Sequence, residues 1–440
     1  MPQETKEKSS TRSPRGPRVP ALDPNQRLAG PRSLGSPASA DCPRRVTEAS
    51  PLPSFATDLP PFELGGRRLW PVVQGGMGVG VSAHRLAGNV ALQGAMGTLA
   101  SVDLRRHHPD LMAASRNAAK AVVDAANLEA LDREIRAAKA IARGHGAIAV
   151  NVMRAVSEYP AYVRRACESG ADAIVMGAGL PLDLPELAAN WPRVALVPIL
   201  SDARGIALVV RKWMRKGRLP DAIVIEHPRY AGGHLGAARL EDLGDPRFDF
   251  ERVIPEALAF FRAEGIGERA VPLVPAGGIN SHERVRELIA LGASAVQLGT
   301  AFAVTEEGDA DPAFKSVLAG AGADDIVEFM SVAGLPARAV RTPWLERYLA
   351  FLPKLSAAAH RKPRCALRFD CLIQCGLRDG VAKIGQFCID TQLAAALKGD
   401  LAKGLFFRGA SALPFGREIR PVRELIGYLL TGTRPAPGPA

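Results

Sequence analysis

The chain has 440 residues, of which 47% are hydrophobic and 23% charged, a composition typical of a globular protein. No run approaches the roughly 18 unbroken apolar residues of a transmembrane helix, so we expect no membrane partner. The net charge of +11 lies at the chain ends, because residues 51–360 hold 34 basic and 34 acidic side chains. Only 5% of the residues are aromatic. Since the middle of the chain is neutral and poor in aromatics, we expect no nucleic-acid partner.

The chain begins with residues 1–57, which are rich in Pro, Arg, Ser and Ala and lack apolar periodicity. This composition predicts a disordered tail, and residues 431–440 predict a second one. The N-terminus shows no apolar stretch of a secretory signal. Six cysteines are too few for a disulfide scaffold, so we expect a reducing, cytoplasmic location.

Eight short apolar runs alternate with longer helix-like segments in the middle of the chain. The runs are residues 71–76, 94–100, 147–152, 172–179, 194–200, 221–226, 271–278 and 294–300. Most are continuously apolar, as in parallel strands that are covered on both faces. Because a doubly wound sheet commonly has only about five to seven strands, eight β–α units predict an α/β fold, a (β/α)8 TIM barrel, which we place at residues 58–334.

The intervening segments carry helix start and stop signals. Residues 82–92 begin with Ser at the expected N-cap, residues 117–144 end in Gly, and residues 201–217 and 280–292 show both signals. After the barrel the pattern changes. Residues 335–355 resemble a helix with its cap, and residues 391–405 are also helical in pattern. Residues 335–430 therefore predict an α-rich C-terminal extension packed on the barrel.

Glycine pairs follow the last two apolar runs. In such barrels the chemistry lies at the carboxyl ends of the strands. Gly277 and Gly278 follow the seventh run, and Gly299 with Thr300 follows the eighth. Glycines that open a helix expose backbone N–H groups, so the two loops together predict a phosphate site, although each alone also suits a tight turn.

Two further strand ends suggest a flat cofactor. Gly75, Gly76 and Met77 follow the first run, and glycines there would let a flavin ring approach backbone amides; an ordinary turn is the alternative. Asn151 ends an otherwise apolar run and needs partners if buried. A ring or ribityl contact would supply them, as would a bond to a neighbouring loop.

The loop after the sixth run contains the candidate catalytic residue. His234 has glycines on both sides in AGGHLG, at the predicted active face, and this setting suits a proton acceptor. His227 follows the strand directly, and we interpret it as structural.

The motifs QGGMG, NVM, GAGLP, AGGHLG, PAGGI and QLGT, in this order, resemble the nitronate monooxygenase family. These are FMN-dependent (β/α)8 enzymes, formerly called 2-nitropropane dioxygenases, and are similar to FMN-dependent enoyl-acyl-carrier-protein reductases. The resemblance covers about residues 65–345. It implies His234 as the catalytic base and the FMN phosphate at the last two loops. The predicted cofactor-binding residues are Gly75, Gly76, Met77, Asn151, Gly179, Glu226, Gly232, Gly233, Gly277, Gly278, Gln297, Gly299 and Thr300.

The function that this resemblance implies is oxidative denitrification. A nitroalkane or alkyl nitronate reacts with O2 to give a carbonyl compound and nitrite, so the expected partners are a small substrate and O2. The alternatives are an FMN-dependent enoyl-thioester reductase that uses NAD(P)H, and a non-redox barrel that binds a phosphate ligand. Family members commonly carry Gln or Glu shortly before AGGH. Here either Glu226 or His227 occupies that place.

Four cysteines lie close together near the C-terminus. Cys365, Cys371, Cys375 and Cys388 follow the spacing C-x5-C-x3-C-x12-C, without the C-x2-C pairs that are usual at zinc and iron–sulfur sites. Their neighbours are apolar, so we predict buried packing and no metal. A metal site and redox chemistry are the alternatives.

Overall fold

The computed structural model describes residues 52–267, 270–361, 365 and 371–436. Most of the predicted N-terminal tail, and residues 437–440 of the second, lie outside these residues. Residues 52–57 form no helix or strand, yet they contact folded elements. The Phe55 ring meets Trp70 edge-on at 6.1 Å, and the Thr57 hydroxyl donates to the Leu430 carbonyl at 2.5 Å. Folded packing thus begins before the expected boundary at residue 58.

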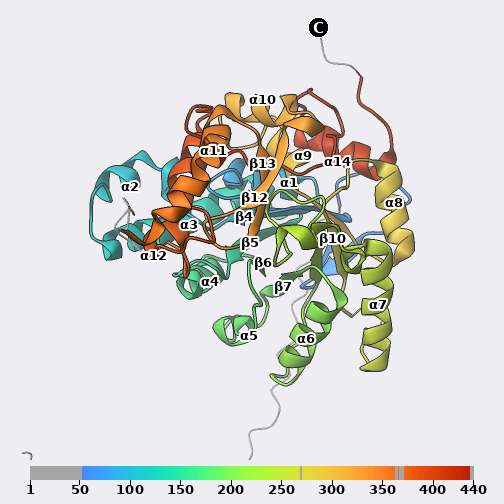
Figure 1. The fold of residues 1–440 in the computed structure, drawn as a ribbon. Helices are drawn as coiled ribbons and strands as arrows, with labels where there is room; N and C mark the ends of the chain where they lie inside the picture. The colour runs from blue at the N-terminus through green and yellow to red at the C-terminus, as the bar shows by residue number, and fades with distance from the viewer. Residues whose placement is uncertain (1–51, 268–269, 362–364, 366–370, 437–440) are drawn as a thin grey trace, which may run out of the picture. The chain divides into compact units, whose positions relative to one another are not determined.

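Eight parallel strands close into a barrel (Figure 1). They are β3 (Val72–Gln74), β4 (Met96–Ala100), β5 (Ala147–Met153), β6 (Ala173–Gly177), β7 (Ala195–Leu200), β8 (Ile223–Glu226), β10 (Leu273–Ala276) and β11 (Val296–Leu298). Strand β11 pairs back onto β3, with Val296 opposite Val72. Each strand lies within one of the eight predicted runs or extends it by one residue, so the (β/α)8 prediction is confirmed.

A helix follows each barrel strand. In order they are α1 (His84–Leu92), α3 (Lys120–Ala142), α4 (Tyr159–Glu168), α5 (Leu184–Leu187), α6 (Ala203–Met214), α7 (Phe250–Ala263), α8 (His282–Leu291) and α9 (Thr300–Ala303). A further helix, α2 (Pro109–Ala114), precedes α3. The 3-10 helices are η1 (Leu104–His107), η2 (Leu240–Gly244), η3 (Pro246–Phe248), η4 (Ala323–Asp325) and η5 (Ala359–Arg361). No helix of the described residues is long and apolar enough to span a membrane.

The predicted helix caps are only partly correct. The caps of α6 and α8 lie one residue after the expected starts at Ser201 and Asn280: Asp202 accepts the Gly205 N–H, and Ser281 accepts the Arg284 N–H. Ser82 does not cap α1, whose N-cap is Ala83. The Ser82 hydroxyl instead accepts the Met77 N–H at 2.9 Å, because the glycine-rich turn after β3 folds back over it.

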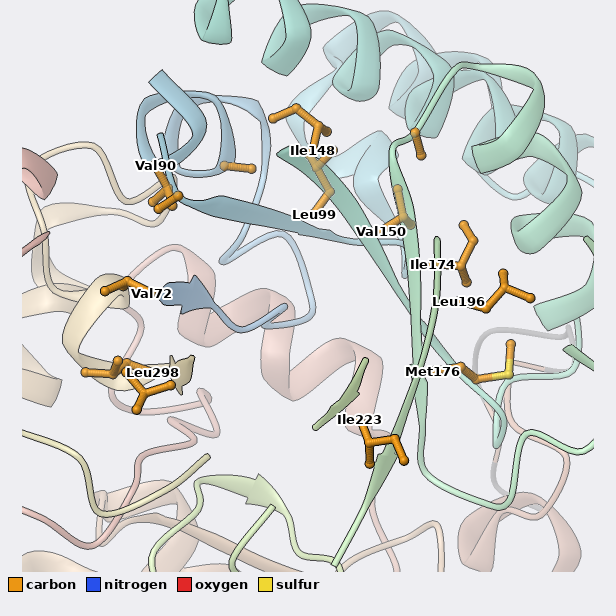
Figure 2. Packing of buried hydrophobic residues seen from close by; sticks show 14 of the residues in the cluster. Val72, Val90, Leu99, Ile148, Val150, Ile174, Met176, Leu196, Ile223 and Leu298 are labelled. Carbon is orange, nitrogen blue, oxygen red and sulfur yellow. The ribbon is translucent and has the colours of Figure 1, made fainter. Parts of the chain in front are cut away.

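Strand side chains alternate between two cores. Ile148 and Val150 of β5 point toward the surrounding helices, as do Ile174 and Leu196 of the neighbouring strands (Figure 2). The inward positions are mostly small: Ala147, Ala149, Ala173, Val175, Ala195 and Val197. The next inward residue along β5 is Asn151. Small side chains therefore fill the barrel axis, and a polar one follows at its carboxyl end.

The amino end of the barrel is closed by a hairpin of β1 (Phe62–Leu64) and β2 (Arg67–Leu69). Its apolar side chains Phe62, Leu64 and Leu69 join the inner core. Among the described residues, this hairpin covers the end of the barrel opposite the carboxyl ends of the strands.

The C-terminal region is α-rich, as predicted, but strands that the sequence did not predict precede its helices. Strands β12 (Ile326–Met330) and β13 (Pro336–Val340) form an antiparallel sheet with the two-residue strand β9 (Gly233–His234). The expected boundary after residue 334 falls in the β12–β13 turn, and residues 336–340 are a strand because they pair on both edges. The helices are α10 (Pro312–Gly320), α11 (Pro343–Ala357), α12 (Gly376–Asp379), α13 (Ile389–Leu397) and α14 (Val422–Thr431). Residues 398–405 do not continue α13, since Gly399 adopts a φ of 73°.

Candidate active site

A cavity of about 780 Å³ lies at the carboxyl ends of the barrel strands. All fourteen predicted site residues line it: Gly75, Gly76, Met77, Asn151, Gly179, Glu226, Gly232, Gly233, His234, Gly277, Gly278, Gln297, Gly299 and Thr300. They come from loops that are separated by up to 225 residues in the chain, and the barrel brings them together because parallel strands end at one face.

The strand register sets part of this face. Ala276, the last residue of β10, is paired with Glu226 of β8 and with Gln297 of β11. Gly277 and Gly278 follow at φ angles of 100° and 77°, which side chains rarely tolerate. A Cβ at Gly278 would also lie 3.0 Å from the Tyr230 ring. This turn therefore requires glycine for both its backbone conformation and its space.

The loop after β11 is braced by a C-terminal segment. The Thr300 hydroxyl accepts the Gly409 N–H at 3.0 Å, and the Ala410 N–H donates to the Tyr230 carbonyl at 3.0 Å. Gly409 and Ser411 line the cavity beside the two glycine loops. No local sequence pattern marks this segment as part of a site.

The AGGH loop is held in a sheet. Gly233 and His234 pair with Arg338 and Ala337 of β13. A side chain at Gly232 would lie 2.5 Å from the Arg408 carbonyl carbon, so glycine there permits close backbone packing. The AGGH loop is thus packed from two sides by the C-terminal region.

His234 is a neutral imidazole whose Nε2 has no hydrogen-bond partner among the described residues. Its Nε2 is buried and makes no hydrogen bond to any residue that the structure describes. Burial lowers the pKa of His234 to about 4, so the ring is uncharged at neutral pH. Phe407 packs against it edge-on at 5.6 Å. Because buried polar atoms are rarely left unpaired, this nitrogen fits a place where a ligand supplies the partner.

Glu226, rather than His227, faces the cavity. The Glu226 carboxyl accepts no hydrogen bond from the described residues, and burial raises its pKa to about 7. Glu226 lines the cavity and is partly buried. His227 is buried outside the cavity wall, with Nε2 3.2 Å from Asp249 and Nδ1 accepting the Arg229 N–H. Both of its ring nitrogens are occupied, which agrees with a structural role.

Two amide side chains complete the polar lining. Asn151 and Gln297 line the cavity, and neither side chain hydrogen-bonds to a described residue. A Cβ on Gly76 would lie 2.4 Å from the Asn151 Cβ, and one on Gly75 would lie 3.2 Å from the Gln297 amide nitrogen. The glycines thus let the first loop pack against both amides, whose donors and acceptors stay available to a ligand.

The C-terminal region also forms an apolar wall. Leu372, Ile389, Leu393 and Phe407 line the cavity. The segment at Leu372 is held to the loop after β5, because the Ile373 N–H donates to the Ala155 carbonyl at 2.8 Å.

The four clustered cysteines do not sit on one helix. Cys375 is the N-cap of α12, and Cys371 lies before it and lines the cavity. Burial raises the pKa of Cys371 to about 12, so it is a thiol at neutral pH. The described cysteines are all free. Within the described ranges, no group of three or more His, Cys, Asp or Glu side chains could hold a metal ion.

Comparisons with known proteins agree with this architecture. Residues 67–432 match the model of a family described as nitronate monooxygenase. A probable nitronate monooxygenase of Bacillus subtilis is 28% identical over 285 residues, which is 63% of this chain and 78% of that protein. The nitronate monooxygenase of Pseudomonas aeruginosa is 38% identical over 118 residues, 27% of this chain and 31% of that protein.

Two solved structures share the fold. FabK from Thermotoga maritima has a TM-score of 0.54 and 21% identity, covering 82% of this chain and 91% of that chain. The nitroalkane oxidase from Streptomyces ansochromogenes has a TM-score of 0.56 and 18% identity, covering 82% and 94%.

Proposed function

This chain belongs to the nitronate monooxygenase family and is an oxidoreductase, and we propose that it uses FMN and O2 to convert nitroalkanes or their nitronates into carbonyl compounds and nitrite. The observation that carries the proposal is a set of four polar side chains around one cavity that make no hydrogen bond to any described residue: Asn151, Glu226, His234 and Gln297. Such groups are expected where a polar ligand completes their hydrogen bonds. The cytoplasmic location stays a prediction.

The residues around the cavity fit FMN. The N–H groups at Gly277, Gly278, Gly299 and Thr300 would hold the phosphate, since all four residues line the cavity and the glycines have no side chain to screen their backbone. The amides of Asn151 and Gln297, which need partners, would bond the polar edge of the ring or the ribityl chain. FMN, when bound, would supply the electron transfer and the reaction with oxygen.

His234 would act as the proton acceptor. Its neutral ring keeps a free lone pair at physiological pH, because burial disfavours the imidazolium. In the proposed step the proton on the α-carbon of a nitroalkane passes to Nε2, and the electron pair of the broken C–H bond stays on the substrate as a nitronate. The new negative charge then stabilises the imidazolium beside it. A substrate that arrives as a nitronate needs no such transfer.

The test is His234→Ala, assayed with a neutral nitroalkane and with its nitronate. Losing a general base costs about 10²–10⁴-fold, so we expect that loss on the nitroalkane, a smaller effect on the nitronate, and retained flavin. His227→Asn is the matched control, because that ring does not line the cavity. Equal losses on both substrates would show a role other than base, and an unchanged rate would reject the assignment.

Assays of the wild-type protein separate the proposed function from its two alternatives. NADPH oxidation with an enoyl thioester, without nitronate turnover, would indicate the reductase. A colourless protein that cannot be reconstituted with FMN would indicate the non-redox barrel.

A further inference from the structure

Arg338 is a buried charge that contacts the turn before His234. Its side chain is 1% exposed, and β13 carries it next to the AGGH loop. Its Nη1 donates to the Pro228 carbonyl at 3.0 Å and also to the Ala231 carbonyl. Nε donates to Glu328 at 3.1 Å, and Nη2 pairs with the same carboxylate. The guanidinium therefore bonds the turn on one side and the neighbouring strand β12 on the other.

Stability alone gives little reason for this arrangement. Burying a guanidinium is costly, and a buried ion pair is often no more stabilising than well-packed apolar residues of similar volume. The partner Glu328 is 44% exposed, so its attraction is weakened by water. What Arg338 does supply is geometry, since its planar fork sets two carbonyls of the turn at fixed directions.

The same strand also holds the loop through its backbone. Gly233 lies opposite Arg338 in the β9–β13 ladder, and His234 lies opposite Ala337. The turn at residues 228–231 connects Glu226, at the end of β8, to this ladder. Any movement of the turn would therefore alter the relative placement of Glu226 and His234.

We propose that Arg338 is a positioning residue: its guanidinium fixes the turn at residues 228–231 and thereby aligns His234 with the α-proton of the substrate. This inference rests on the proposed function. Arg338 touches neither the substrate nor the cofactor position, since it does not line the cavity. It acts through the carbonyls of Pro228 and Ala231.

Arg338 also affects the charge balance of the cavity. Its positive charge opposes the rise in the pKa of Glu226 that burial causes. The other titratable groups that line the cavity are Asp202, Arg204, Tyr230, His234, Cys371 and Asp390. Asp202 is engaged as the cap of α6, and Asp390 is paired with Arg106 at 2.5 Å. Removing the Arg338 charge should therefore move the Glu226 titration to higher pH.

The experiment compares Arg338→Gln and Arg338→Lys holoenzymes with the wild type, using nitroethane and ethyl nitronate. Misplacing a catalytic group by about 1 Å can cost about 10²-fold, so we expect kcat on nitroethane to fall about 10–10²-fold in Arg338→Gln, with KM and FMN content retained. Ethyl nitronate turnover should change far less. Arg338→Lys should recover part of the loss, because an ammonium can donate to the turn but cannot fork. The pH–rate profile on nitroethane should shift to higher pH in Arg338→Gln, which loses the positive charge. It should not shift in Arg338→Lys, which keeps that charge.

The matched control is Glu328→Gln, which removes the partially exposed charge partner but leaves the donors to the turn. We expect wild-type rates in this variant. Wild-type kcat in Arg338→Gln, or equal losses on both substrates, would overturn the inference. If Arg338→Gln does not fold, Arg338→Lys decides by the same comparison. If His234→Ala discriminates between the substrates and the Arg338 variants do not, this inference fails alone. If His234→Ala also fails to discriminate, the assignment of His234 as the base fails. A wild type that turns over neither substrate would reject the proposed function.

Discussion

Glu226→Gln should make the pH dependence of folding stability flatter. The folded-state pKa of Glu226 is raised by burial to about 7, from an ordinary value of 4.5. Each pKa unit corresponds to about 1.4 kcal/mol, so the ionised carboxylate costs the folded state about 3 kcal/mol above pH 7. Below pH 4.5 the carboxyl is protonated in both states, and the cost vanishes. Between these limits the unfolded chain loses its proton first, and the wild type loses stability as the pH rises.

Glutamine has nearly the same shape and cannot ionise. The free energy of unfolding of Glu226→Gln minus that of the wild type should therefore grow by about 3 kcal/mol between pH 4.5 and pH 7, and then stay constant. Urea unfolding of flavin-free protein at several pH values measures this difference, because bound flavin would add its own stabilisation to the folded state.

Glu63→Gln is the matched control, since Glu63 is exposed on β1 and makes no ion pair with a described residue. Its difference from the wild type gives the baseline for a glutamate outside the cavity. A Glu226→Gln difference that follows this baseline, or that decreases as the pH rises, would refute the conclusion that the Glu226 carboxyl is held in a desolvated site.

Two further predictions concern the cofactor loops and the cysteines. Gly278→Val should lose flavin, because a β-branched residue is strained at a φ of 77° and its Cβ would press on the Tyr230 ring. Gly66→Val is the control for backbone strain, since Gly66 has a φ of 79° with open space around it. Full flavin content in Gly278→Val would contradict the phosphate placement. For the cysteines, we expect thiol titration to detect the four C-terminal thiols only after unfolding, in line with the high pKa of Cys371, and elemental analysis to find no bound metal; one zinc, or several irons with sulfide, per chain would overturn the packing interpretation.

The barrel and the position of the site could be predicted from local sequence patterns. A strand that is covered on both faces must be apolar throughout, so each of the eight runs is visible within about seven residues. The turn after such a strand needs glycine wherever its backbone adopts positive φ or approaches a neighbour, so Gly277 and Gly278 mark a strand end without any knowledge of their neighbours. Parallel closure then places every marked end at one face.

Choices between similar residues required the tertiary structure. Glu226 and His227 are adjacent, and the period of two along a strand places them on opposite sides, but only the packed barrel shows that Glu226 faces the cavity while His227 bonds Asp249. Ser82 likewise has the local signature of a helix cap. Its hydroxyl instead accepts a hydrogen bond from the backbone N–H of Met77, five residues earlier in the chain. A local rule fails there because a competing partner is brought close by the turn.

The partners of the AGGH loop could not be predicted from the sequence. Arg338 donates to carbonyls 107 and 110 residues earlier in the chain. The Gly409 N–H donates to the Thr300 hydroxyl, which lies 109 residues earlier. An isolated Arg between apolar residues carries no local indication of which backbone it will bond, because a buried guanidinium can be satisfied by any carbonyls that the fold presents. The sequence alone therefore determined the barrel strands and the glycine turns of the site, whereas the fold decided what holds His234 in place.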